Sequence, residues 1–258
     1  MPAVVDTEGG GLYVVKFRGA GQGTKVLVAE LIVGGLAQRL GLPLPELALV
    51  DVSPRFGRSE PDPEIQELLR KSHGINVGMR YLEGAFNFDP SAAGDLIAPS
   101  LAARIAWLDA FTTNPDRTHR NPNLLIQDRT PWLIDHGAAL YAHHDWAGVD
   151  EQRARTPFAM IRSHVLLGVA EDISDVDRAA ADALGGSVID EVVATVPDDL
   201  LMDPIGGKTD FASGAEARDR YAWYLRTRLA GRADWLAEAE RAQQQLRIEA
   251  PQHLKARR

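Results

Sequence analysis

Three side chains whose oxygen atoms can bind cations lie close together in the sequence. Asp116 and Asn121 belong to the segment Asn-Pro-Asp-Arg-Thr-His-Arg-Asn, and Asp135 begins the segment Asp-His-Gly a short distance later. Phosphoryl transfer needs one carboxylate beside the attacking hydroxyl, together with an amide and a second carboxylate whose oxygens hold Mg2+ against the phosphates. Asp116, Asn121 and Asp135 are the residue types that this chemistry requires.

The elements predicted around these residues bring them together. Apolar residues from Leu101 to Phe111 line one face of a helix, which Pro115 prevents from continuing. Two short apolar runs, 124–126 and 132–134, flank a turn-forming stretch and predict a hairpin. The hairpin returns the chain to the loop that follows the helix, so the aspartate after its second strand is expected beside that loop.

Each of these segments alone also fits an ordinary turn. Asp116 can end a helix, Asn121 can start a turn, and Asp135-His136-Gly137 can be a surface turn. The step of five positions from Asp116 to Asn121 nevertheless matches the Asp-to-Asn step of the protein-kinase catalytic loop. Because the order of loop, hairpin and aspartate also matches, we favour the catalytic interpretation.

Two charged residues occur in apolar surroundings nearer the N-terminus. Glu30 is the single ionisable residue between Val26 and Gln38, in a predicted helix. An unpaired interior carboxylate costs several kcal/mol, so a cation from a neighbouring element is expected, and Lys16 on the preceding strand is the nearest candidate. A strand lysine paired with a helix glutamate is also how kinases hold the lysine that binds ATP phosphates. The alternative is that Glu30 faces solvent and Lys16 extends along a sheet edge.

The N-terminal part of the chain predicts a small α+β unit, and the rest is mainly helical. The strands and helices of the first part are expected at Leu12–Phe17, Thr24–Leu40, Leu47–Val52, Glu64–Ser72 and Asn76–Leu82. Further helices are expected at Phe158–Gly168, Val176–Leu184, Ser187–Val196 and Gly214–Arg247. Loops rich in proline and glycine are expected at Ser53–Pro63, Gly84–Pro99 and Asp203–Gly214. We therefore predict a two-lobed α+β fold, with a small β-rich N-lobe over residues 1–80 and a mainly helical C-lobe over 81–258.

The composition excludes several classes of function. The formal net charge is −8, the wrong sign for a protein that binds nucleic acid or anionic membranes. The chain has no cysteine, which excludes disulfides, thiolate zinc sites and cysteine nucleophiles and favours a cytoplasmic location. No signal peptide or apolar stretch long enough to span a bilayer is evident, so no membrane partner is expected.

Two other groups of residues have both a functional and a structural interpretation. The stretch Gly19–Gly23 either cradles phosphates through backbone N–H groups or is a flexible turn between a strand and a helix. His136, His143, His144 and Asp145 are residue types that bind metals, but adjacent histidines project in different directions. A solvated loop is the simpler interpretation of these histidines.

The sequence resembles the HipA-like kinases over most of residues 12–140. The segments Val14–Phe17, Ala29–Leu31, Gly41–Pro45 and Asn114–Asn121 occur in the order typical of that family. The loop around Asp116 is also similar to the Asp-Arg-His…Asn loop of phosphatidylinositol kinases. The resemblance implies a protein-kinase-like fold and a phosphotransferase that uses ATP and Mg2+, with a hydroxyl group as acceptor, in particular that of a protein serine or threonine.

The resemblance also implies a role for each residue of the site. Lys16 would contact the ATP phosphates, and Glu30 would orient Lys16. Asp116 would be the catalytic base, whereas Asn121 and Asp135 would bind Mg2+. The hinge expected to meet the adenine is the segment Met79–Leu82, with Arg80, Tyr81 and Leu82 as its binding residues.

Two features depart from the family pattern. Little sequence precedes the strand with Lys16, so the glycine loop expected over the phosphates is shortened, displaced to Gly9–Gly11 or Gly19–Gly23, or missing. Thr118 stands where the family's loop normally has a histidine, and His119 follows it.

Two alternative functions stay open on the sequence alone. A pseudokinase of the same fold would act through protein contacts, but it would be expected to lack one of Lys16, Asp116, Asn121 or Asp135. A metal-dependent hydrolase would use Asp116, Asp135 and nearby histidines, and it would give Lys16 and Glu30 no task.

Overall fold

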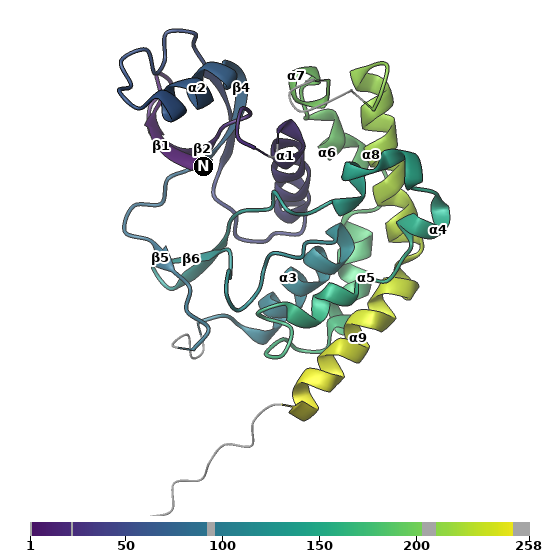
Figure 1. The fold of residues 1–258 in the computed structure, drawn as a ribbon. Helices are drawn as coiled ribbons and strands as arrows, with labels where there is room; N and C mark the ends of the chain where they lie inside the picture. Colours follow the sequence, from purple (N-terminus) through teal and green to yellow (C-terminus); the bar gives the residue numbers. More distant parts are fainter. Residues whose placement is uncertain (1, 22, 92–95, 203–209, 250–258) are drawn as a thin grey trace, which may run out of the picture.

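An antiparallel four-stranded sheet forms the N-terminal side of the molecule in the computed structural model, which describes residues 2–21, 23–91, 96–202 and 210–249 (Figure 1). The strand order is β1-β2-β4-β3. The strands are β1 (Pro2–Asp6), β2 (Leu12–Lys16), β3 (Leu47–Val52) and β4 (Gly74–Arg80). Alternation along β2 buries Tyr13 and Val15 on one face and places Val14 and Lys16 on the other.

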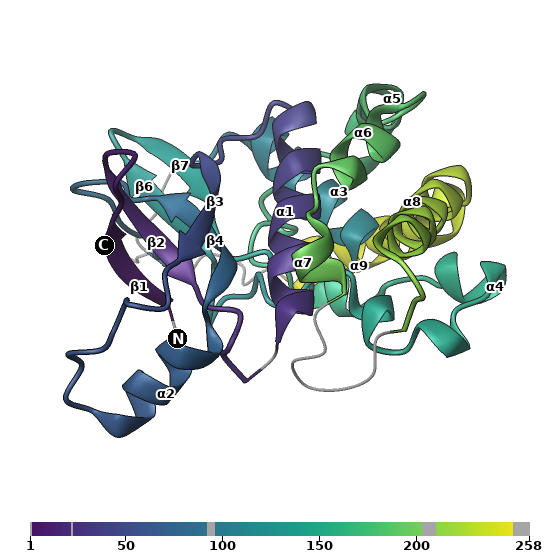
Figure 2. The same cartoon turned by 90° about the horizontal axis from the view of Figure 1, so that it is seen from above.

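The two faces of this sheet are covered by different helices. The short helix α2 (Pro63–Lys71), capped at its start by the Asp62 side chain, packs Leu69 against Phe17 and Val52 in a small apolar cluster. The longer helix α1 (Thr24–Arg39) lies between the sheet and the C-terminal helices, as Figures 1 and 2 both show. Because α1 is apolar nearly all round, it is buried on both sides.

A second, three-stranded sheet leads into the helical part of the chain. It has the order β5-β6-β7 and consists of β5 (Phe86–Asn87), β6 (Leu124–Gln127) and β7 (Thr130–Leu133). Strands β6 and β7 form the predicted hairpin, with Asp128 and Arg129 in the left-handed conformation at its turn. Helix α3 (Pro99–Thr112) precedes this hairpin and is almost wholly buried.

The remaining elements are helical. The α-helices are α4 (Glu151–Ala154), α5 (Ile173–Ala183), α6 (Val188–Ala194), α7 (Asp198–Leu201), α8 (Gly214–Ala230) and α9 (Arg232–Glu249). Short 3-10 turns are η1 (Tyr141–His144), η2 (Trp146–Gly148) and η3 (Ala159–Ser163). This sheet followed by helices confirms the predicted α+β class, and its division into lobes at residue 80 remains a prediction. Among the helices of the described residues, none has the length and apolar character needed to cross a membrane.

Two predicted helices are wrong in detail. The segment predicted as a helix over 158–168 has only the 3-10 turn η3, because its backbone bonds to another segment: the N–H of Val165 donates to the carbonyl of Arg117 at 3.0 Å. The long helix predicted from Gly214 to Arg247 is interrupted at Gly231. The Arg155 side chain packs there so closely that a Cβ on Gly231 would lie 2.5 Å from its Nε.

Two further differences concern regions without a clear periodic pattern. Strand β1 was not predicted, although it pairs along its whole length with β2. Of the predicted loop Asp203–Gly214, residues 203–209 lie outside the part of the chain that the structure describes.

Candidate active site

The strand lysine and the helix glutamate lie together, and a third predicted residue joins them. The Nζ of Lys16 on β2 donates to Oε1 of Glu30, which is buried in the middle of α1. The same Nζ donates to Oδ1 of Asp135 at 2.6 Å. One ammonium group therefore links the sheet, α1 and the segment that follows the β6–β7 hairpin.

The charges in this cluster shift one another's ionisation. Burial alone would lower the pKa of Lys16, but the carboxylates of Glu30 and Asp135 outweigh it and raise the pKa above the ordinary lysine value. Burial likewise would raise the pKa of Asp135, and the ammonium of Lys16 outweighs it, so this pKa is lowered. Both groups are therefore ionised at neutral pH.

A cavity of about 280 Å3 opens beside this cluster. The side chains of Lys16, Glu30 and Asp135 line one part of it, and Val77 and Met79 of β4 add apolar surface. The predicted hinge residues Arg80, Tyr81 and Leu82 also line it, as do Leu125 and Ile134 from the hairpin. A mostly apolar cleft with a few charged groups at one side is the usual form of a site for a small ligand or cofactor.

The predicted base lies in a loop that two amides hold. Oδ2 of Asp116 accepts hydrogen bonds from the Nδ2 atoms of Asn121, at 2.8 Å, and of Asn123, at 3.0 Å. Asn121 is exposed, and because its nitrogen faces Asp116, its amide oxygen points away from that carboxylate. Sequence reasoning did not assign Asn123, although its position two residues after Asn121 in a polar loop was the available signal.

Backbone conformation places Asp135 and keeps α1 close to it. Asp135 has φ of 55°, a left-handed conformation that is uncommon outside glycine and that recurs at functional sites. Two residues later, a Cβ on Gly137 would lie 2.4 Å from a methyl carbon of Val26 and 3.2 Å from Oε1 of Glu30. The glycine of Asp-His-Gly is thus required by the close approach of α1.

A second cluster of charges lies next to the loop around Asp116 and was not predicted from the sequence. Asp109 on α3 is fully buried, and its carboxylate accepts hydrogen bonds from Arg117 Nε at 2.6 Å and from His164 Nε2 at 2.9 Å. Burial would raise the pKa of Asp109, but the charge of Arg117 and the hydrogen bond from His164 keep it well below the usual carboxyl range. The available signal was one carboxylate in an apolar helical stretch, the same pattern that indicated Glu30.

Buried contacts also fix the end of α3, from which the loop starts. Arg228 on α8 donates to the carbonyl of Phe111 at 2.7 Å and to that of Ala110 at 3.0 Å, which satisfies two of the free carbonyls at a helix end. The rings of Trp107, Phe111 and Trp235 pack with centroids 5.4 to 6.0 Å apart and hold α3 against α9.

The first glycine stretch lies away from Lys16, and the second leads into the start of α1. Gly9–Gly11 follows β1, and in the β1–β2 register Lys16 faces Pro2 at the opposite end of the hairpin. The N–H of Gly19 donates to Oγ of Ser72 at 3.2 Å, so it is already engaged. Gly23 precedes the first residue of α1 without capping it through a side chain.

The histidines after Asp135 do not gather into a metal site. His143 is buried with its Nδ1 3.1 Å from the hydroxyl of Tyr221, whereas His144 is exposed. In the described ranges, no set of three or more histidine, aspartate or glutamate side chains is arranged to hold a metal ion. The hydrolase alternative therefore has no histidine-based centre in this part of the chain.

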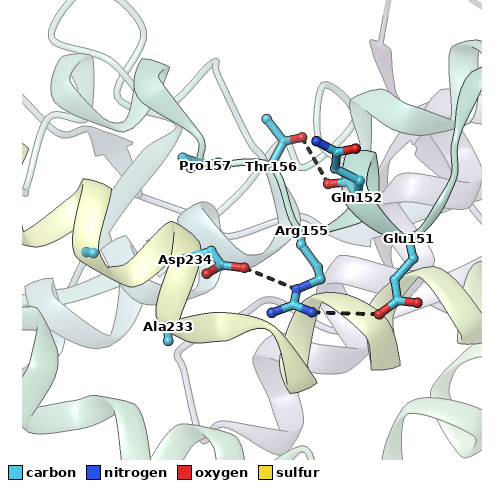
Figure 3. A pocket seen from close by; sticks show the side chains of 8 residues that line it. Glu151, Gln152, Arg155, Thr156, Pro157, Ala233 and Asp234 are labelled. Carbon is cyan, nitrogen blue, oxygen red and sulfur yellow. Dashed lines mark hydrogen bonds and ion pairs between the residues drawn. The ribbon is translucent and has the colours of Figure 1, made fainter.

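A larger hollow lies elsewhere, between α4 and the start of α9 (Figure 3). It measures about 950 Å3 and is wide open. Arg155 crosses it, with its guanidinium 3.1 Å from Asp234 and 3.7 Å from Glu151. Its one guanidinium is paired with two carboxylates, and none of the predicted site residues lines it.

Comparison with known proteins identifies one family. The sequence model of the HipA-like kinases matches residues 2–203, well over half of the chain. The match covers both the Lys16 cluster and the loop around Asp116. No curated protein matches the sequence at the significance required.

Proposed function

Because the chain belongs to the HipA-like kinase family, whose members are phosphotransferases that use ATP, we propose that it transfers the γ-phosphoryl group to the hydroxyl of a protein serine or threonine. One observation supports this assignment most strongly. Lys16 is held by Glu30 and Asp135 at the side of a cleft that the predicted hinge also lines. A lysine in this arrangement can give up a carboxylate partner for the phosphates of a nucleotide.

In this proposal each residue of the site has one task. Apolar side chains of the cleft and the backbone of Arg80–Leu82 bind the adenine, and Lys16 binds the phosphates. Asp116 accepts the proton of the acceptor hydroxyl, with its carboxylate oriented by Asn121 and Asn123. Catalysis then consists mainly of positioning and of neutralising charge.

We also propose that Asn121 and Asp135 hold Mg2+. Both provide oxygen atoms, which Mg2+ prefers, and Asp135 lies beside the cleft with a depressed pKa that keeps it anionic. A bound Mg2+ would neutralise charge on the phosphates. These two residues fit that ion better than a transition metal, because an amide and a carboxylate offer oxygen atoms and no nitrogen or sulfur ligand.

We propose that the two lobes each carry part of the site. Residues 1–80 carry the lysine strand and the glutamate helix, and residues 81–258 carry the catalytic loop and the metal-binding segment. The cleft is lined from both parts, by β2 and β4 on one side and by the hairpin on the other. The hinge Arg80–Leu82 connects them.

Incubation with γ-labelled ATP and Mg2+, followed by mass spectrometry for phosphorylated residues, tests the proposed function. We expect label on serine or threonine of the protein itself or of an added protein acceptor, and loss of labelling in Asp116→Ala. Nucleotide binding by Asp116→Ala should be unchanged, since this residue does not line the cleft. Labelling that survives the substitution would overturn the assignment of Asp116, and nucleotide binding without any transfer would favour the pseudokinase alternative.

A further inference from the structure

A buried ion pair beneath the catalytic loop contacts both that loop, which contains Asp116, and the segment that contains Asp135. The side chains of Arg117 and Asp109 are both completely inaccessible to solvent. Arg117 directly follows the proposed base, and Asp109 lies on α3, a helix with no residue in the nucleotide cleft. This pair has no task in the proposed reaction, although it lies next to the residues that perform it.

The side chain of Arg117 extends from the catalytic loop to the segment that contains Asp135, one of the two residues proposed to bind Mg2+. Its Nη1 donates to the carbonyl of Asn123, the residue whose amide holds the Asp116 carboxylate. The same atom lies 3.5 Å from the carbonyl of Ile134, and Nη2 lies 3.3 Å from Nδ1 of His136. Ile134 and His136 are the two neighbours of Asp135, so one guanidinium spans the distance between the two catalytic segments.

The Asp109 carboxylate holds this arginine and two other side chains, those of Asn114 and His164. Oδ1 of Asp109 accepts from Nδ2 of Asn114 at 3.0 Å, and Oδ1 of Asn114 accepts from the N–H of Asp116 at 3.1 Å. The Leu166 N–H donates to Nδ1 of His164, which leaves Nε2 of that ring as the donor to Asp109. Asp109 therefore anchors the loop at its start and at its arginine, together with the segment that runs beside it.

Stability alone is a weak explanation for such a pair. Removing two charges from water costs about as much as their attraction returns, and apolar residues of the same volume often stabilise a core equally well or better. The contacts of Asp109 are instead directed at the catalytic loop and at His164 in the segment beside it. This arrangement suits a residue whose role is to fix the distance between the reacting groups.

We propose that Asp109 is a positioning residue: through Arg117 and Asn114 it holds the base Asp116 in fixed geometry relative to the metal-binding Asp135. The inference rests on the proposed function, because it assigns Asp109 to the reaction of that same site. An error of about 1 Å in such a geometry is enough to cost about 10²-fold in rate.

The test compares two substitutions of the same kind, Asp109→Asn and Asp177→Asn. Asp177 is a matched control, because it also joins α3 to other helices, accepting from Trp107 Nε1 and from Arg232 Nε at 3.0 Å each, but it does not contact the catalytic loop. The measurements are kcat and KM for ATP, the thermal midpoint, and the affinity for Mn2+ in the presence of a non-hydrolysable ATP analogue. Asn114→Ala is the second variant, since it cuts the link to Asp116 while leaving the ion pair in place.

We expect Asp109→Asn and Asn114→Ala to lower kcat by about 10²-fold and to weaken Mn2+ binding, with KM for ATP changed by less than about threefold. Asp177→Asn should lower the thermal midpoint without either effect.

If the wild type is active and Asp109→Asn loses no more kcat than Asp177→Asn, the inference is wrong and the proposed function stands. If the wild type binds Mn2+ and nucleotide but transfers nothing, the proposed function fails, and an unchanged Mn2+ affinity in Asp109→Asn and Asn114→Ala would then overturn the inference as well. A wild type that binds no Mn2+ with nucleotide would overturn both.

Discussion

Two clusters of opposite charges hold the candidate active site together, and they differ in their access to solvent. In the cleft cluster, the side chains of Lys16 and Asp135 are 22% and 44% exposed. In the sealed cluster, those of Arg117 and Asp109 are both 0% exposed. The cleft cluster can exchange its partners for a ligand, whereas the sealed cluster has no route by which a ligand could enter.

The hydrogen bonds of the two clusters match this difference. Arg117 is satisfied by a carboxylate, two backbone carbonyls and a histidine ring, all of them within the protein. Lys16 has two carboxylate partners, Glu30 and Asp135, and both border the open cavity. Both clusters pair a cation with a carboxylate. The sealed pair is suited to fixed support and the cleft pair to binding a ligand, because protein surrounds the first completely and the second only in part.

The largest difference is expected in stability. Replacing Asp109 by Ala leaves Arg117 as an uncompensated buried charge, so we expect the free energy of unfolding to fall by about 3–5 kcal/mol. Replacing Asp135 by Asn leaves Lys16 with Glu30 and with access to water, so its loss should be about 1 kcal/mol or less. Urea denaturation of both variants measures the difference, and equal losses would contradict the distinction between a sealed and an open cluster.

The next effect concerns activity through the cleft cluster. In Glu30→Gln, Lys16 keeps Asp135 but is no longer oriented from α1, so we expect kcat/KM for ATP to fall by about 10- to 100-fold. The matched control is Glu191→Gln, because Glu191 pairs with Arg39 of the same helix at 2.9 Å on the exposed surface. Steady-state kinetics on both variants measures kcat/KM for ATP. A similar loss of kcat/KM in Glu191→Gln would mean that the substitutions act by destabilising α1 and not through Lys16.

A smaller effect is expected where α1 approaches the Asp-His-Gly segment. A methyl group on Gly137 would overlap Val26 and press on Glu30, so Gly137→Ala should lower the free energy of unfolding by about 1–3 kcal/mol. Gly9→Ala is the control, since a Cβ there would have no atom within 4 Å. Adding Val26→Ala to Gly137→Ala removes the overlapping methyl group, and we expect part of the loss to be recovered in denaturant titrations. A double variant no more stable than Gly137→Ala would show that this contact is not the cause.

The cleft residues could be expected from the sequence because short-range periodicity places them. Alternation along β2 puts Lys16 on the face of Val14, and an apolar helix with one carboxylate places Glu30 inside the molecule. The spacing from Asp116 to Asn121 and the hairpin before Asp135 follow from turn signals of the same kind. Local patterns therefore indicated the residues of the cleft and the order of the elements that carry them, and their roles remain predictions.

The sealed cluster depends on contacts that no local pattern reports. Asp109 accepts a hydrogen bond from His164, which belongs to a segment whose apolar residues predicted a helix, yet that segment pairs with the loop around Asp116. At the break between α8 and α9, the distant Arg155 likewise packs against Gly231. Where the partners are far apart in sequence, a lone carboxylate in an apolar stretch indicates that a partner exists but does not identify it.

The smallest expected effect extends the comparison to His143, a buried group whose ring contacts the hydroxyl of Tyr221 rather than a carboxylate. Burial, and after it the positive charges of His144 and Lys25, lower the pKa of His143 well below 6.5. The unfolded chain therefore takes up a proton as the pH falls through 6.5 while the folded protein does not, so stability is full above that pH and declines below it. We expect His143 to contribute about 1 kcal/mol to the loss between pH 7 and pH 5.5. The loss should therefore be smaller in His143→Gln, in which His136 with its lowered pKa still contributes, and it should be retained in full in His119→Gln, since His119 is exposed. Urea denaturation across this range measures it, and an unchanged pH dependence in His143→Gln would show that this ring is not the group responsible.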